Sequence, residues 1–151
     1  MLANQQVHTS KTPAELAELN NTRHRLLLNL KALADVLEQQ NDLVGAIQTC
    51  ERAIRLIEET NLITTTKSEL YLRLGISLMK QRDFGRALDS LFAALKASMA
   101  FERDDSIYEA NNELGNLFLE MDRALMRAAI SRIVGSQDTH PTAKESINRR
   151  A

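Results

Sequence analysis

The residues best suited to catalysis or metal binding are few and scattered along the chain. The histidines are His8, His24 and His140, and none has a histidine or cysteine partner at the spacing of metal ligands. Cys50 is the sole cysteine, so no disulfide can form within the chain. Because Cys50 lies among periodic apolar residues, we expect a buried packing thiol and not a nucleophile. The sequence therefore predicts no metal site.

Acidic pairs occur at Glu58–Glu59 and Asp104–Asp105, where helices are expected to meet. Carboxylates at such junctions are typical of solvated helix ends and helix-start charges. The chain has no glycine-rich phosphate loop, no Ser-x-x-Lys and no His-Glu-x-x-His. We therefore expect no catalytic residues, no cofactor and no enzymatic activity.

Composition favours an all-α protein. The 151 residues include only 5 Gly and 2 Pro, with 4% aromatic and 44% hydrophobic residues. A β-sandwich or barrel needs more turn and aromatic residues than this. The net charge of −1 lacks the basic excess of a nucleic-acid binder, so we expect no nucleic-acid partner. Apolar runs are too short to cross a bilayer and the start resembles no signal peptide, so we predict a cytoplasmic protein without membrane insertion.

Apolar residues with helical spacing predict five helices. Capping boxes at Thr12–Glu15, Thr66–Glu69 and Ser106–Glu109 predict three of the helix starts. The longest periodic series is made of leucines at steps of three, four and seven: Leu16, Leu19, Leu26, Leu30, Leu33 and Leu37. Further periodic stretches cover 43–57, 68–81 and 84–101, and a fifth helix is expected from near Ile107.

Three segments are expected. Residues 1–11 are a flexible N-terminal arm, 12–135 a helical domain and 136–151 a polar tail, in which Pro141 could open a short helix. Within the domain, 106–134 is predicted to be one long helix that Gly135 closes as its C-terminal cap. The alternative is a short turn at Met121–Asp122.

An internal repeat is the most informative feature of the sequence. Ala34, Gly75 and Gly115 each follow a leucine, and they recur at a nearly constant interval. A small residue at this place lets a second helix approach closely, and Ala87 is the expected partner of Gly75 across the helix crossing. In the third copy the small residue and the alanine of the next helix are three residues closer together than in the second copy. This difference is close to one helical turn, so we expect the helix of the third copy to continue unbroken.

Two sets of residues carry a resemblance to the tetratricopeptide repeat (TPR) family, which places a large residue, Leu-Gly, another large residue and then Ala-x3-large-x2-Ala on two antiparallel helices. The two sets are Tyr71, Leu74, Gly75, Leu78, Ala87, Leu91, Ala94 and Leu30, Leu33, Ala34, Leu37, Ala46, Cys50, Ala53. The period resembles that of the longer, roughly 40-residue type. The resemblance implies repeats at about 27–60, 68–101 and 106–134, stacked as helical hairpins in a short right-handed solenoid. Some other helical bundle remains the alternative.

The resemblance also implies a groove along the first helices of the repeats that binds a peptide segment or partner protein. Carried over by position, its residues are Lys31, Leu72, Arg73, Ile76, Met79, Asn112, Asn116 and Leu119. Another part of the chain could instead cover the apolar middle of this groove. Acidic residues at Asp35 and Glu109 would repel a carboxylate, which disfavours the carboxylate clamp of co-chaperone relatives.

The last predicted helix carries more apolar residues than one packing face needs. We expect Met126, Ile130 and Ile133 to form a self-association surface, with a homodimer as the leading assembly. The predicted function is a protein-interaction module or scaffold. The alternatives are a self-associating, secretion-chaperone-like helical protein and the sensory part of a larger signalling system.

Overall fold

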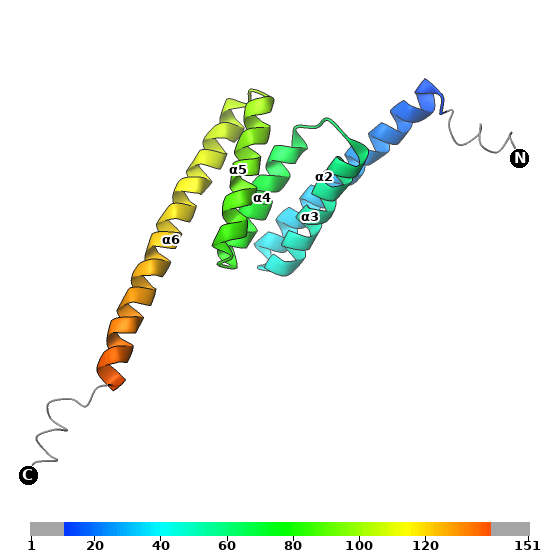
Figure 1. Cartoon of the computed structure of the whole chain (residues 1–151). Helices are drawn as coiled ribbons and strands as arrows, with labels where there is room; N and C mark the ends of the chain where they lie inside the picture. Colours follow the sequence, from blue (N-terminus) through cyan, green and yellow to red (C-terminus); the bar gives the residue numbers. More distant parts are fainter. Residues whose placement is uncertain (1–10, 140–151) are drawn as a thin grey trace, which may run out of the picture. The chain divides into compact units, whose positions relative to one another are not determined.

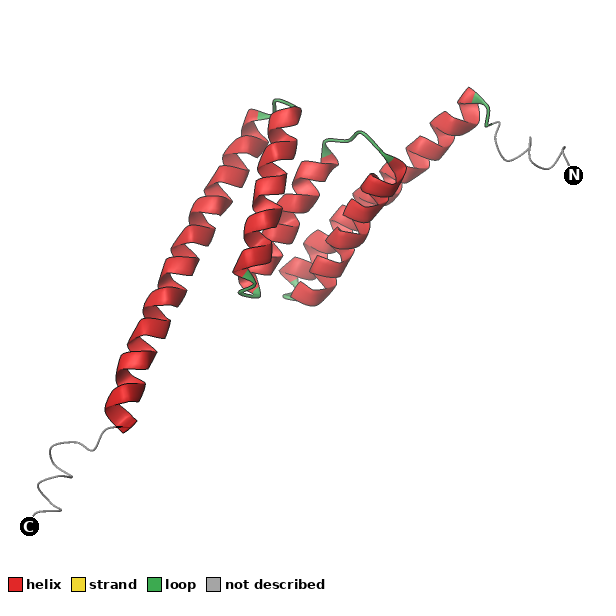
Figure 2. Cartoon of the chain, viewed as in Figure 1, coloured by secondary structure: helices red, strands yellow, loops and turns green. Residues whose placement is uncertain are grey.

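The computed structural model describes residues 11–139, and this part of the chain is helical throughout apart from its short connections (Figures 1 and 2). The expected all-α class is confirmed. The expected arm up to residue 10 and the tail from residue 140, with its helix after Pro141, lie outside the described residues. The helices are α2 (Pro13–Gln39), α3 (Leu43–Thr60), α4 (Thr66–Lys80), α5 (Phe84–Ala100) and α6 (Asp104–Thr139).

The chain divides into two compact units, residues 1–114 and 115–151. The first contains α2 to α5 and the opening turns of α6, and the second contains the rest of α6. In the first unit α2 packs on α3, α3 on α4 and α4 on α5, and α2 also contacts α4. Figure 1 shows these four helices running side by side.

The ends of α2 to α5 share one backbone motif. Each helix is followed by a residue of positive φ, which is Asn41, Asn61, Arg82 or Glu102. The amide of that residue donates to a carbonyl three residues back, and the next amide donates to a carbonyl five residues back. These two bonds define the Schellman motif, which usually recruits glycine. The interval from Asn41 to Arg82 equals that from Asn61 to Glu102, and it is also the interval from Ala34 to Gly75.

The helix starts agree with the predicted capping boxes only at α2. There the Thr12 side chain accepts from the Glu15 amide and the Glu15 carboxylate accepts from the Thr12 amide. At α4 the box is wrong, because Thr65 is the N-cap residue and it makes no side-chain cap bond. At α6 the box is also wrong, because the helix already begins at Asp104 and Ser106 lies inside it.

Two aspartates act as N-caps, of α3 and of α5. Asp42 accepts from the Gly45 amide at 3.0 Å, and Asp83 accepts from the Arg86 amide at 3.5 Å. Each follows directly on a positive-φ residue, so the end of one helix and the cap of the next fit into a connection of three residues.

The core of the first unit is closely packed around Gly75. A Cβ built on Gly75 would lie 2.5 Å from Leu91 Cδ2 and 3.4 Å from the Leu91 backbone nitrogen. The close approach of α4 and α5 is thus as predicted, but the residue that meets Gly75 is Leu91 and not Ala87. The side chains with almost no exposure in this unit include Leu27, Cys50, Leu70, Leu78 and Leu91.

Helix α6 runs without a break from Asp104 to Thr139. The continuous helix is therefore the correct alternative, and the turn at Met121–Asp122 is wrong. Gly135 does not cap this helix, since the helix continues for four more residues. At Gly115 an added Cβ would meet no atom within 4 Å, so the third copy of the small residue makes no close approach of the Gly75 kind.

Candidate interaction surfaces

Ion pairs join α2 to α4 along the face where the groove was predicted. Arg73 Nε lies 2.9 Å from Asp35 Oδ1, and Arg73 Nη1 lies 3.8 Å from Glu38 Oε2. Lys80 Nζ donates to Glu38 Oε1 at 2.9 Å. The Glu38 side chain is only 12% exposed, and its carboxylate is shared between the two cations. The charged side chains of this face therefore neutralise one another within the chain.

A second group of charges extends this face to the start of α6. Lys31 pairs with Glu69, and the other Glu69 oxygen lies 3.6 Å from Arg103. Arg103 also lies 3.5 Å from Asp105. Lys31, the expected basic residue of the groove, thus already has an anionic partner. A free carboxylate would have to compete with Glu69 for it.

The apolar middle of the predicted groove is mostly covered. Leu72 is only 9% exposed, while Ile76 and Met79 are half-buried. A hollow of about 220 Å³ opens beside Leu72, and Lys31 and Arg73 contribute to its lining. The remainder of the lining is Glu69, Arg103, Asp105, Ser106 and Glu109, so cations and anions are present in equal number. The hollow has no excess charge with which to select a charged ligand.

The rest of the predicted groove lies on α6. Asn112 is exposed at the end of the first unit, and Asn116 and Leu119 are exposed in the second unit. Lys31, Leu72 and Arg73 are the predicted residues that the structure brings together around one hollow.

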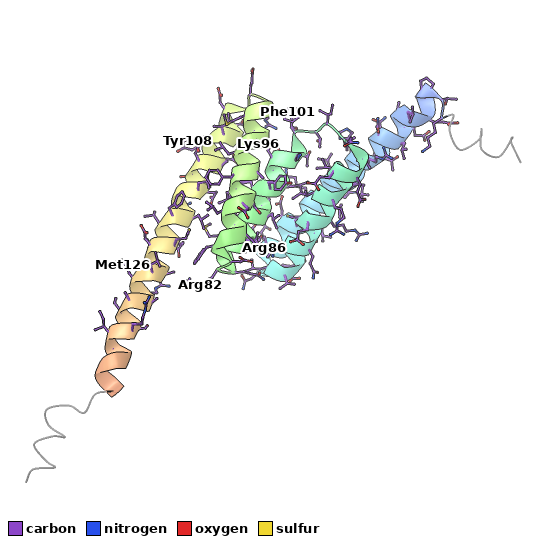
Figure 3. The ribbon with its side chains drawn as sticks, in the orientation of Figure 1. Arg82, Arg86, Lys96, Phe101, Tyr108 and Met126 are labelled. Atoms are coloured by element: carbon purple, nitrogen blue, oxygen red, sulfur yellow. The ribbon has the colours of Figure 1, made fainter. Side chains whose placement is uncertain are left out.

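The second unit exposes the largest set of apolar side chains on any described helix segment of its length. We call it the α6 stripe. Met126, labelled in Figure 3, is its most exposed member at 66%, and Phe118 is its least exposed at 49%. The stripe consists of Phe118, Leu119, Leu125, Met126, Ile130, Ile133 and Val134. It includes all three residues predicted for self-association.

Basic residues accompany the stripe. Along the span of the stripe the charged residues are Glu120, Asp122, Arg123, Arg127 and Arg132, so its first part is acidic and its part from Arg123 onward is basic. Arg123 donates to Glu120 Oε1 at 2.7 Å, one turn earlier on the same helix. An apolar helix face flanked by cations is suited to an apolar partner surface that carries acidic residues.

Cys50 is fully buried in α3. Burial raises the pKa of its thiol from 9.0 to about 12, with a smaller contribution from the nearby Asp35 and Glu38 carboxylates. A thiol with this pKa stays protonated at neutral pH and is a poor nucleophile. The side chain therefore acts as a packing residue.

The charge pairs between α2 and α4 were missed by the sequence reasoning, although a signal for them exists. Lys31 is as far from Glu69 along the sequence as Asp35 is from Arg73. The separation within each pair is shorter than the interval from Ala34 to Gly75 by about one helical turn. Comparing charges at that offset would have found both pairs.

In comparisons with protein-family models, with curated proteins and with solved structures, nothing matches this chain. Among the helices of residues 11–139, none is both long and apolar enough to cross a membrane. In the same residues no group of His, Cys, Asp or Glu side chains is arranged to hold a metal ion.

Proposed function

We propose that this chain is a protein-interaction module, built from TPR-like hairpins in a short right-handed solenoid, that binds a partner protein through the α6 stripe. The Schellman motif and the aspartate caps recur at the same interval as the small residues, which supports the repeat. The contact between α2 and α4 supports it too, since the first helices of successive repeats lie next to each other in a solenoid. A cytoplasmic location and the absence of enzymatic activity remain predictions.

The observation that carries the proposal is the α6 stripe. Seven large apolar side chains are each about half or more exposed over residues 118–134. Scattered exposed leucines are ordinary, but a continuous apolar face on one helix marks an association surface. A partner helix laid along this face would bury it in the helix-in-groove manner, with anchors spaced three, four and seven residues apart.

The charges favour a different protein over a second copy as the occupant of the stripe. Pairing two α6 helices would gather the arginines of both copies around one interface, and like charges there are unfavourable. An amphipathic helix with acidic residues beside its apolar face would meet them with the opposite charge. Self-association through Met126, Ile130 and Ile133 is the competing outcome of the experiment.

Affinity purification with the tagged full chain tests the proposal. Ile130→Asp adds a charge to the stripe, and Ala128→Asp adds the same charge to an exposed residue about 200° around the helix. We expect a discrete protein to co-purify with the wild type and with Ala128→Asp but not with Ile130→Asp. Recovery of the same proteins with all three forms, or of further copies of the chain alone, would contradict the proposal.

A further inference from the structure

A second apolar face, on α2, is independent of the α6 stripe. Its leucines follow a heptad pattern, with alternating steps of three and four residues from Leu16 to Leu37. Arg23 is the one interruption. Such spacing places all these side chains along one edge of a helix, the arrangement that a coiled coil uses to meet another helix. We call these residues the leucine seam: Leu16, Leu19, Leu26, Leu30, Leu33 and Leu37.

The first unit leaves much of the leucine seam in solvent. Leu26 is 47% exposed and Leu33 is 48% exposed. Helix α2 buries a different edge, since Leu27 and Ala34 are each only 1% exposed. These two residues follow Leu26 and Leu33 by one position, or about 100° around the helix. The fold of the unit half-buries Leu19, Leu30 and Leu37 but leaves Leu16, Leu26 and Leu33 exposed.

A hollow lies beside the seam, between α2 and α3. It has a volume of about 350 Å³ and is open to solvent. Leu26 and Leu30 line it from α2, and Leu56 lines it from α3, with Arg52, Arg55 and Glu59 completing it. One surface thus carries both protruding leucines and a recess of the kind that a leucine side chain fills in knobs-into-holes packing.

From these observations we infer that α2 pairs with α2 of a second copy of this chain, with the leucine seams in contact. A surface that meets its own copy presents identical charges to itself, so charged flanks would repel. The outer flank of the seam is uncharged over its central turns, where it carries Thr22, Asn29 and Val36. This flank contrasts with the α6 stripe, which has basic neighbours from Arg123 to Arg132 and is suited to a different partner.

The two helices run antiparallel in this pairing. In a parallel pair Arg23 of each copy would face the other at the same level of the seam, and the two like charges would repel. An antiparallel pair separates the two arginines along the seam. In an antiparallel pair the outer flank of one α2 also faces the outer flank of the other. Charges placed on these flanks can therefore test the pairing.

The available area approaches what a stable pair buries. The 27 residues of α2 and the 18 of α3 give lengths of about 40 and 27 Å at 1.5 Å per residue. With helices about 10 Å across, the exposed face of this hairpin covers about 700 Å² per copy. Stable interfaces bury about 800 Å² per partner. The seam with the α3 residues beside it comes close to that area.

The first experiment measures the mass of the full chain by light scattering, with helicity followed by circular dichroism. We expect the wild type to have twice the 17.0 kDa monomer mass at high micromolar concentration. Leu26→Glu with Leu33→Glu should give the monomer mass at unchanged helicity. The control is Leu28→Glu, which alters a 55%-exposed leucine on the other side of α2 and should remain dimeric.

The second experiment keeps the leucines and changes only the exposed flank. A variant with Thr22→Lys and Asn29→Lys and another with Thr22→Glu and Asn29→Glu should each be monomeric at low salt. Mixing the two should restore the dimer mass, because an antiparallel pair sets these flanks against each other with opposite charges.

The inference is overturned if the wild type is monomeric, or if the seam variant stays dimeric. It is also overturned if Leu28→Glu dissociates the dimer as well, or if the mixed flank variants do not associate. If Ile130→Asp were the one variant that dissociated the dimer, the interface would lie on the α6 stripe and not on the leucine seam. Since the partner of the α6 stripe is tested by co-purification of a different protein, the two proposals fail separately.

Discussion

Replacing Gly75 tests the close approach of α4 and α5 quantitatively. An alanine Cβ at this position would lie 2.5 Å from Leu91 Cδ2 and 2.6 Å from Leu91 Cγ. Leu91 has no exposed surface, and its backbone nitrogen is 3.4 Å from the same point, so the side chain cannot move away without moving α5. Overpacking of this kind costs about 1–3 kcal/mol, whereas the exchange of glycine for alanine in a helix returns about 1 kcal/mol.

We therefore expect Gly75→Ala to lower the free energy of unfolding by about 1 kcal/mol and Gly75→Leu by about 3 kcal/mol or more. In a chain of this length the leucine variant should melt about 6–12 °C lower. Thermal and urea unfolding followed by circular dichroism at 222 nm measure both changes.

Gly115→Ala is the matched control. Gly115 also lies in a helix and follows a leucine, but no atom stands within 4 Å of its added Cβ. Here only the gain in helix propensity operates, so the variant should be as stable as the wild type or up to about 1 kcal/mol more stable. If Gly75→Ala were stabilised to the same extent as Gly115→Ala, the packing described for α4 and α5 would be refuted.

Three further predictions follow from the cap motif, the ion pairs and the buried thiol. Glu102→Gly should stabilise the chain by about 0.5–1 kcal/mol in urea unfolding, because glycine adopts positive φ without strain, while Asn61→Gly should change little; equal effects would contradict this. Glu38→Gln should cost about 0.5–1 kcal/mol, less at high salt, whereas the exposed Glu109→Gln should cost nothing measurable; a salt-independent loss would argue against the ion pairs. Cys50 should react with a thiol reagent only as fast as the chain opens, and rapid labelling of the native protein would be the contrary result. The free energy of unfolding should fall as pH rises from 9 towards 12, because the thiol of the unfolded chain then loses a proton that the folded chain keeps.

Local patterns in the sequence were sufficient to predict the helices and the close approach of α4 and α5 at Gly75. The spacing of apolar residues indicates the five helices, and the small residue at Gly75 correctly marks a close helix contact. The missing three residues of the third copy predict the unbroken α6. Each of these conclusions depends on the 3.6-residue period, which can be counted directly along the chain.

Details that depend on backbone geometry or on neighbouring helices were harder to predict. The capping box at Thr66–Glu69 fails because Thr65, not Thr66, is the N-cap residue, and Glu69 is paired instead with Lys31 of α2 and with Arg103, which precedes α6. The helix ends at Arg82 and Glu102 use positive φ without glycine or asparagine, so composition gave no sign of the motif.

The candidate site was the least predictable feature. Positions carried over from the TPR resemblance identify residues on one face, but they do not tell which of those side chains the chain itself occupies. Lys31 and Arg73 are held in ion pairs, and Leu72 is largely covered. The apolar stripe of α6, in contrast, was visible in the sequence because more than one face of that helix is apolar.

The most direct test of the proposed function is site-specific photo-crosslinking in living cells with the full chain. A photoreactive side chain is placed at Ile130, in the α6 stripe, and in a second form at Ala128, on the opposite side of the helix. We expect the Ile130 form to crosslink to a discrete protein other than this chain, and the Ala128 form not to. Crosslinking of the Ile130 form only to this chain itself, or equal crosslinking from both positions, would contradict the account.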